Sequence, residues 1–268
     1  FMVAGLVTLL GQLMVRTLVQ RDLGAAELGY FQAAWVLSMT YLGFVLGAMS
    51  TDYYPRLTAA IHDHAKANRL VNEQTEVALL LAGPVLLAVL AMAPWVIQLL
   101  YTEEFAPAAT ILRWQILGDV LKIASWPLSF IILAAGDGRT FMLAETVAMT
   151  VYAGTTWLLL PWFGVVATGI SFLLMYMIFL PLVYLLARRR TGFYWNRTVI
   201  RDLALLNIAA VLVAACGAWH QWLGVTVGLV LAAVFGFIAL LRLARMAELD
   251  GALGRLAAVS RHFYSKQV

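Results

Sequence analysis

The sequence predicts an all-α fold, a polytopic bundle of about eight helices that cross a membrane. The chain has 268 residues, of which 63% are hydrophobic and 12% are charged. A soluble domain carries about 25% charged residues, so this composition is typical of a membrane protein. The mean hydropathy of +0.88 agrees with that assignment. Apolar runs of about 20 residues, which is the length that spans a bilayer as a helix, recur along the whole chain.

Each expected span is an apolar run bounded by polar or helix-ending residues. The spans lie at roughly 1–20, 28–54, 75–100, 107–134, 140–160, 164–187, 203–219 and 222–243. Pro55 is expected to end the second span, and Pro127 is expected to kink the fourth. We expect the polar segment 56–74 to be the longest connection, and the basic tail after Leu243 to lie at the membrane surface or to be disordered.

The distribution of basic residues predicts the orientation of these spans. Of the 18 Lys and Arg residues, only Arg21 falls in the loops on one side. Arg16, Arg113 and Lys122 lie inside spans, and the others gather on the opposite side. The positive-inside rule places that basic side, and with it the C-terminus, in the cytoplasm. The isoelectric point near 9.3 therefore reflects loops at the membrane, and we expect no nucleic-acid partner.

The sequence begins within an apolar run. Phe1 already lies in an apolar run, without an initiator Met, a charged region or a small-residue cleavage site. We therefore expect no signal peptide, and we expect the chain to be the C-terminal part of a longer protein.

The sequence holds no pattern typical of an enzyme site. There is no GxxxxGK[ST] phosphate loop, no HExxH and no GxSxG. Cys216 is the only cysteine, and His62 and His64 flank Asp63 in what we expect to be a solvated loop. We therefore expect no catalytic residue, no metal site and no bound cofactor, and we expect that the protein is not an enzyme.

Charged residues inside the apolar spans are the candidate functional residues, because a charge within the bilayer is costly and usually serves pairing or a substrate path. They are Arg16 in the first span, Asp52 in the second, Arg113, Asp119 and Lys122 in the fourth, and Glu145 in the fifth. On the fourth span, one helical face carries Gln115, Asp119, Lys122 and Trp126. That face must point at other helices or at a water-filled cavity.

Two interpretations of these charges stay open. In the first, the cations of the first and fourth spans outnumber Asp119 in one cavity, which suits an anion such as a phosphate or pyrophosphate. The carboxylate is then a candidate site for a proton or another coupling ion. In the second, Asp119 simply pairs with Lys122, both arginines reach the periplasmic interface, and Asp52 and Glu145 are wetted near helix ends.

At these residues the chain resembles the Wzx-type translocases of O-antigen and enterobacterial common antigen. The resemblance is carried by Phe105-Ala106-Pro107-Ala108-Ala109, by Trp114-Gln115-Ile116-Leu117-Gly118-Asp119-Val120-Leu121-Lys122 and by Leu143-Ala144-Glu145. Looser matches, which recur across related exporters, are Gly29-Tyr30-Phe31-Gln32-Ala33-Ala34-Trp35 and Tyr54-Pro55-Arg56-Leu57. The resemblance covers residues 1–190.

The resemblance implies the fold of the multidrug/oligosaccharidyl-lipid/polysaccharide exporter superfamily, in which two MATE-like lobes of six helices face a central cavity. The implied parts are a second six-helix lobe at 1–187, a basic cytoplasmic loop at 188–202, two additional helices at 203–243 and a basic cytoplasmic tail at 244–268. The implied activity is to flip an undecaprenyl-pyrophosphate-linked oligosaccharide, an O-antigen-type repeat unit of lipopolysaccharide biosynthesis, across the bacterial inner membrane by alternating access. A proton or sodium gradient would drive it, and a polysaccharide polymerase complex is an expected partner.

On this basis the candidate residues receive roles. The pyrophosphate is expected to bind Arg16, Arg113 and Lys122. The glycan is expected to contact Gln115, Trp114 and Trp126. Ion coupling is expected at Asp119, Glu145 and Asp52.

Three other classes of protein are alternatives. A MATE-type drug or metabolite cation antiporter would have the same fold but would favour an acidic cavity over the expected cationic one. A membrane enzyme of polysaccharide assembly would need a sizeable loop over its substrate, and the expected loops are short. A purely structural scaffold would not explain the charged fourth span.

Overall fold

The computed structural model describes the backbone of residues 2–264, together with their side chains other than those at 2–4, 44, 48, 50 and 247–264. Its elements are α1 (Met2–Leu23), α2 (Ala25–Ala60), α3 (His64–Leu100), the 3-10 turn η1 (Glu103–Phe105), α4 (Ala106–Ala134), α5 (Gly138–Phe163), α6 (Val166–Thr191), α7 (Arg197–Trp219) and α8 (Gln221–Tyr264). Within this range, 7 helices, α2 to α8, are long and apolar enough to cross a membrane. The predicted all-α membrane bundle is confirmed.

The helices extend further than the apolar spans that predicted them. Pro55 lies inside α2 rather than at its end, and the segment 56–74, which we expected to be a loop, is helical except at 61–63. Asp63 caps α3 by accepting a hydrogen bond from the backbone N–H of Lys66 at 3.1 Å. The loop prediction was wrong because hydropathy marks the part of a helix that suits lipid and does not register the polar turns that continue beyond it.

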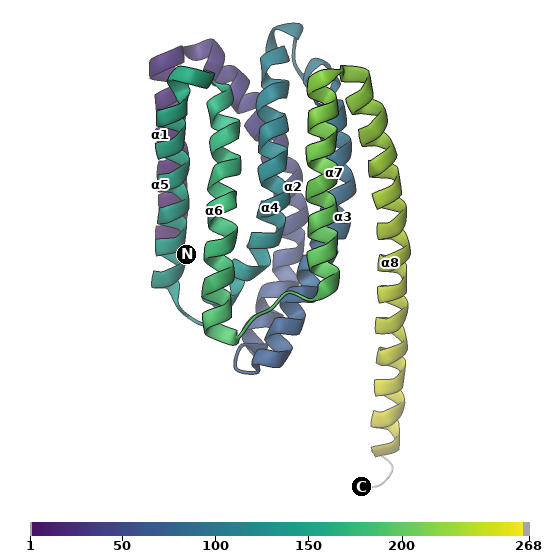
Figure 1. Cartoon of the computed structure of the whole chain (residues 1–268). Helices are drawn as coiled ribbons and strands as arrows, with labels where there is room; N and C mark the ends of the chain where they lie inside the picture. The colour runs from purple at the N-terminus through teal and green to yellow at the C-terminus, as the bar shows by residue number, and fades with distance from the viewer. Residues whose placement is uncertain (1, 265–268) are drawn as a thin grey trace.

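The predicted basic loop at 188–202 is also mostly helical. α6 ends at Gly192, which adopts a left-handed conformation with φ 64°, and α7 begins after Asn196, whose side chain accepts a backbone hydrogen bond of 2.7 Å. The basic tail does not form a separate segment either, since α8 continues as one helix to Tyr264 and extends past the ends of the other helices (Figure 1).

The helix α4 lies at the centre of the bundle. It packs on α6, α3 and α2. The helices α1 and α5 pack together at one edge, and α7 and α8 pack on α3 at the other edge (Figure 1). The central helix is thus the one that carries Asp119 and Lys122, and neighbouring helices must serve these polar groups because lipid cannot.

Two asparagines of α3 hold the connection between α6 and α7. Asn68 donates to the backbone carbonyl of Thr191 at 2.9 Å and accepts from the hydroxyl of the same residue at 2.8 Å. Asn72 donates to the carbonyl of Tyr194 at 3.1 Å and accepts from the backbone N–H of Asn196 at 2.7 Å. These bonds satisfy the backbone groups of a short connection and fix the position of α7 against α3.

Glycine allows α4 and α6 to approach each other closely. A Cβ atom at Gly169 would lie 2.7 Å from the backbone oxygen of Ile111 and 2.8 Å from the Cβ of Trp114. We expect Gly169→Ala to lower the free energy of unfolding by about 1–3 kcal/mol, because the backbone oxygen cannot move aside cheaply. Thermal unfolding of the purified variant in detergent measures this change.

The matched control is Gly154→Ala in α5, where an added Cβ would meet nothing within 4 Å. Alanine is favoured over glycine inside a helix by about 0.5–1 kcal/mol, so this variant should be as stable as the wild type or slightly more stable. Equal stability of the two variants would contradict the close contact between α4 and α6.

Candidate functional site

Four helices place polar side chains around the middle of α4. We call Ser38, Asp119, Lys122, Glu145 and Tyr176 the central polar cluster. They come from α2 (Ser38), α4 (Asp119 and Lys122), α5 (Glu145) and α6 (Tyr176). A hydrogen bond and electrostatic interactions connect them, so residues far apart in the sequence form one group.

Asp119 is the most enclosed acid of the cluster. Its side chain is fully buried, and its Oδ2 accepts a hydrogen bond of 2.6 Å from the hydroxyl of Ser38. Its other carboxylate oxygen has no hydrogen-bond partner among the described residues. A buried carboxylate with a single hydrogen bond has lost more hydrogen bonds to water than the protein replaces. Binding of a cation or a proton to Asp119 would therefore stabilise it.

Lys122 lies one turn further along α4, and its ammonium group lies near a sulfur atom and an aromatic ring. Its Nζ lies 3.0 Å from the Sδ of Met39 and 6.0 Å from the ring centroid of Phe172. Asp119 and Glu145 both attract this ammonium group, but no direct ion pair joins it to either carboxylate in the part of the chain described. The ammonium group is therefore available to a further anion.

The edge formed by α1 and α5 completes the surroundings of the cluster. Glu145 accepts a hydrogen bond of 3.4 Å from the hydroxyl of Thr8 in α1. Arg16, about two helical turns after Thr8 in α1, is partly buried and interacts electrostatically with Tyr152. The ring of Tyr152 is buried and stacks on Trp35 of α2, with 6.2 Å between ring centroids.

Buried polar atoms without a hydrogen-bond partner surround the cluster. Among the described residues they include both amide atoms of Gln115, one oxygen of Asp119, and the hydroxyls of Tyr152 and Ser171. An unsatisfied buried polar group costs about 1–3 kcal/mol. Their concentration on α4, α5 and α6 is typical of a site that receives a polar ligand or an ion.

The structure does not bring Arg113 and Trp114 to this cluster, although the sequence analysis placed them in one cavity with Lys122. Both line a separate cavity between α4, α6 and α7. The guanidinium of Arg113 lies 3.6 Å from where a Cβ of Gly217 in α7 would be. The reason is helical geometry: these two residues lie on a different face of α4 from Asp119.

Asp52 and Trp126 also lie outside the cluster. Asp52 is exposed and pairs with Arg56 one turn along α2 at 2.9 Å, as expected for a carboxylate near a helix end. Trp126 packs on Tyr53 and Phe130, with ring centroids 6.0 and 4.5 Å away. Trp126 was predicted to share a helical face with Lys122, but its ring packs against other aromatic rings and not against the cluster.

These positions change the charge that the sequence led us to expect. Without Arg113, the cation of the central polar cluster is Lys122, which the carboxylates of Asp119 and Glu145 attract, while Arg16 interacts with Tyr152 beside the cluster. The central polar cluster thus holds two acids and one base, and the expected cationic excess is absent from the described cluster. A bound anion would have to compete with the carboxylates for Lys122.

A second group of charges was missed by the sequence analysis. We call Glu76, Arg201, Asp202 and Arg242 the peripheral ion cluster. Arg201 pairs with Asp202 at 3.0 Å, and Arg242 contacts both Asp202 and Glu76. The sequence analysis assigned Arg201 and Arg242 to loops. The signal that could have indicated these ion pairs is that two acids, Glu76 and Asp202, each lie next to a long apolar run.

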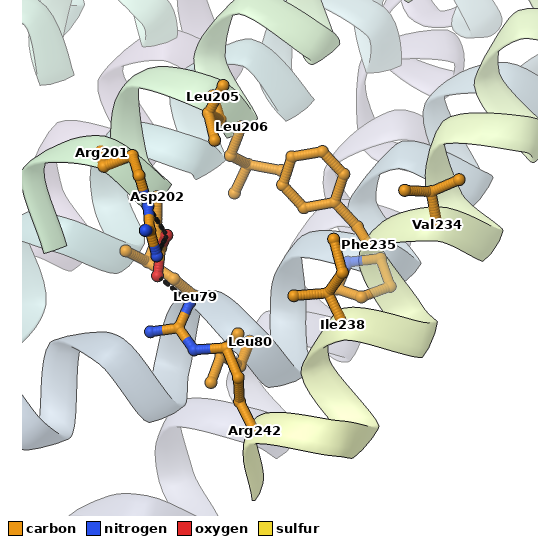
Figure 2. A pocket seen from close by; sticks show the side chains of 11 residues that line it. Leu79, Leu80, Arg201, Asp202, Leu205, Leu206, Val234, Phe235, Ile238 and Arg242 are labelled. Carbon is orange, nitrogen blue, oxygen red and sulfur yellow. Dashed lines mark hydrogen bonds and ion pairs between the residues drawn. The ribbon is translucent and has the colours of Figure 1, made fainter. Parts of the chain in front are cut away.

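The peripheral ion cluster borders a cavity of about 490 Å³ between α3, α7 and α8. Figure 2 shows Asp202 between the two arginines, with apolar side chains across the cavity. The rest of the lining is formed by Leu79, Leu80, Pro84, Leu205, Leu206, Val234, Phe235 and Ile238. The helices α7 and α8 are therefore attached to α3 through largely buried ion pairs as well as apolar contacts.

Parts of the chain are similar in sequence to known proteins. Residues 1–110 match a family described as polysaccharide biosynthesis proteins. The chain is 25% identical over 181 residues to the lipid III flippases of Escherichia coli K12 and Shigella flexneri, which covers 66% of this chain and 43% of each relative. The chain thus spans less than half the length of the curated relatives it matches.

A solved structure shows the same fold. The lipid II flippase MurJ, in an inward closed conformation, superimposes with a TM-score of 0.68 at 13% sequence identity. The match covers 90% of this chain and 53% of that one. This likeness shows a shared fold, and the sequence matches confirm the predicted resemblance to lipid-linked oligosaccharide flippases.

Proposed function

We propose that this chain forms part of a flippase that moves an undecaprenyl-pyrophosphate-linked oligosaccharide of the O-antigen type across the bacterial inner membrane by ion-coupled alternating access. The observation that carries the proposal is the central polar cluster, which places buried acids and a basic side chain at mid-depth of an apolar bundle. Charges at this depth are costly, and they are typical of a substrate or ion path. The similarity to lipid III flippases supports the class of substrate.

In this proposal Lys122 and Arg16 bind the pyrophosphate, because both are basic groups without a direct ion pair among the described residues. Moving a bare pyrophosphate through hydrocarbon would be prohibitive, and a cation on its path lowers that barrier. An inside-negative potential also favours outward movement of an anion, by about 2.3 kcal/mol per charge per 100 mV. The aromatic pair proposed to contact a sugar is Trp35 with Tyr152, rather than Trp114 or Trp126.

Asp119 and Glu145 are the proposed sites of the coupling ion, a proton or sodium. The unpartnered oxygen of Asp119 supports this role, and Asp52 is left out because it is an exposed partner of Arg56. We further propose an inner-membrane location with the C-terminus in the cytoplasm, in accordance with the basic loops, and contact with a polysaccharide polymerase complex.

The proposal is tested by expressing the gene in an E. coli strain that lacks its own lipid III flippase and measuring surface polysaccharide. Restored polysaccharide at the surface is the expected result. If the protein is present in the membrane at normal amounts and the lipid-linked precursor still accumulates, the proposed substrate class is refuted.

The role of Asp119 is tested separately. Asp119→Asn keeps the shape of the side chain and its bond to Ser38 but removes the ionisable group. We expect flipping of a labelled lipid-linked oligosaccharide in vesicles to lose its response to an imposed proton or sodium gradient. The control is Asp52→Asn, which should respond as the wild type does; a gradient response that survives in Asp119→Asn would remove this residue from coupling.

The two acids of the central polar cluster favour a second candidate, a MATE-type drug or metabolite cation antiporter, because they are available to bind a cationic drug. Efflux of a fluorescent cationic dye by the same cells separates the two proposals. Dye efflux that Asp119→Asn abolishes, without restored polysaccharide, would support the antiporter.

A further inference from the structure

A cavity of about 410 Å³ lies between α4, α6 and α7, on a different face of α4 from the central polar cluster. Its lining includes Arg113 and Trp114 of α4, Leu173 of α6, and Val211 and Ala218 of α7. Arg113 is seven residues from the start of α4, or about 10 Å along the helix. The cavity is thus near the end of the bundle at which α7 turns into α8 (Figure 1).

Arg113 is the only charged side chain of this lining. It is partly buried, and it makes no hydrogen bond or ion pair with any described residue. Its guanidinium lies against α7, 3.6 Å from the position of a Cβ at Gly217. A guanidinium group within an apolar bundle is costly without an anion, whereas the guanidinium of Arg242 contacts two carboxylates.

Apart from Thr110, the remaining lining is largely apolar and suits a hydrocarbon chain rather than a soluble anion. Leu117 and Leu173 form one wall, and Val211, Ala214 and Ala218 form the other. Arginine pairs with phosphate through two parallel hydrogen bonds. A ligand that combines a phosphate with an apolar chain therefore satisfies both parts of the cavity.

We propose that the cavity between α4, α6 and α7 binds the phosphate of an anionic membrane lipid, with Arg113 as its counter-ion and the lipid chain against α6 and α7. The lipid belongs to the leaflet at the end of the bundle that holds the α7–α8 turn. This site is separate from the central polar cluster, and it does not depend on transport. Two lipids share the required chemistry, namely a polyprenyl phosphate and an acidic phospholipid.

Binding is measured by native mass spectrometry of the purified protein in neutral detergent. The probes are undecaprenyl phosphate, phosphatidylglycerol and, as a zwitterionic control, phosphatidylcholine. We expect Arg113→Gln to weaken saturable binding of at least one anionic lipid about tenfold or more, since hydrogen bonds to a charged group are the strong ones. Arg139→Gln is the matched control, because Arg139 is exposed at the start of α5.

A second variant tests the cavity without changing its charge. Ala218→Phe fills the apolar side and should weaken binding of the same lipid while Arg113 stays in place. An effect confined to undecaprenyl phosphate identifies a carrier-lipid site, and an effect on phosphatidylglycerol identifies a phospholipid site. The proposal is overturned if Arg113→Gln binds both anionic lipids as the wild type does, or if Ala218→Phe leaves binding unchanged.

Discussion

Replacing Lys122 with alanine is expected to lower flipping about 10- to 100-fold, which makes it one of the two largest effects that the structure predicts. A hydrogen bond to a charged group contributes about 1.5–3 kcal/mol, and each 1.4 kcal/mol is a factor of ten. The variant also leaves Asp119 and Glu145 without the cation that attracts them, so they would repel a pyrophosphate. Surface polysaccharide in the complemented flippase-deficient strain measures the loss.

Lys66→Ala is the matched control for this experiment, because Lys66 is exposed at the start of α3. It should restore polysaccharide as well as the wild type does. Lys122→Arg, which keeps the charge, should retain part of the activity. Normal polysaccharide with Lys122→Ala, at equal amounts of protein in the membrane, would show that this lysine does not hold the substrate.

Replacing Arg242 with alanine is expected to destabilise the protein by about 3–5 kcal/mol, because it leaves the largely buried carboxylate of Glu76 without its cation and that of Asp202 with only the exposed Arg201. The side chains of Glu76 and Asp202 are only 12% and 11% exposed, and Arg242 contacts both. The unfolding midpoint in detergent should fall by roughly 10 °C. The helices α7 and α8 should separate from α3 first, since this cluster joins them.

The control for Arg242 is Arg56→Ala, which removes an exposed pair with Asp52 and should leave the midpoint unchanged within error. Adding Glu76→Gln and Asp202→Asn to Arg242→Ala should recover part of the stability, because no largely buried carboxylate is then left without its cation. If Arg242→Ala unfolds at the wild-type temperature, the peripheral ion cluster does not hold α8 to the lobe.

The fold class followed from composition alone, and the order of the helices followed from the spacing of apolar runs. The ends of the helices did not. The segment 56–74 was expected to be a loop because it is polar, yet α2 and α3 both continue into it. A capping residue such as Asp63 decides where a helix starts, and hydropathy does not register it.

The candidate site was predicted in part. Asp119 and Lys122 were identified because charges are rare in apolar spans, and the structure joins them with Glu145. Arg113 was grouped with them because it lies on the same helix, but it faces α7. Ser38 and Tyr176 carry no signal in the sequence, since a serine or tyrosine in an apolar run is common.

Which helices form and which of them carry charge could be predicted from the sequence, because both depend on the residues of one segment and on their affinity for water or lipid. Which charges meet could not be predicted, because it depends on how the helices pack. The contact of Ser38 with Asp119 joins residues 81 positions apart, and that of Glu76 with Arg242 joins residues 166 apart. Such contacts depend on how each helix is rotated against its neighbours, and in an apolar environment many rotations bury similar surfaces.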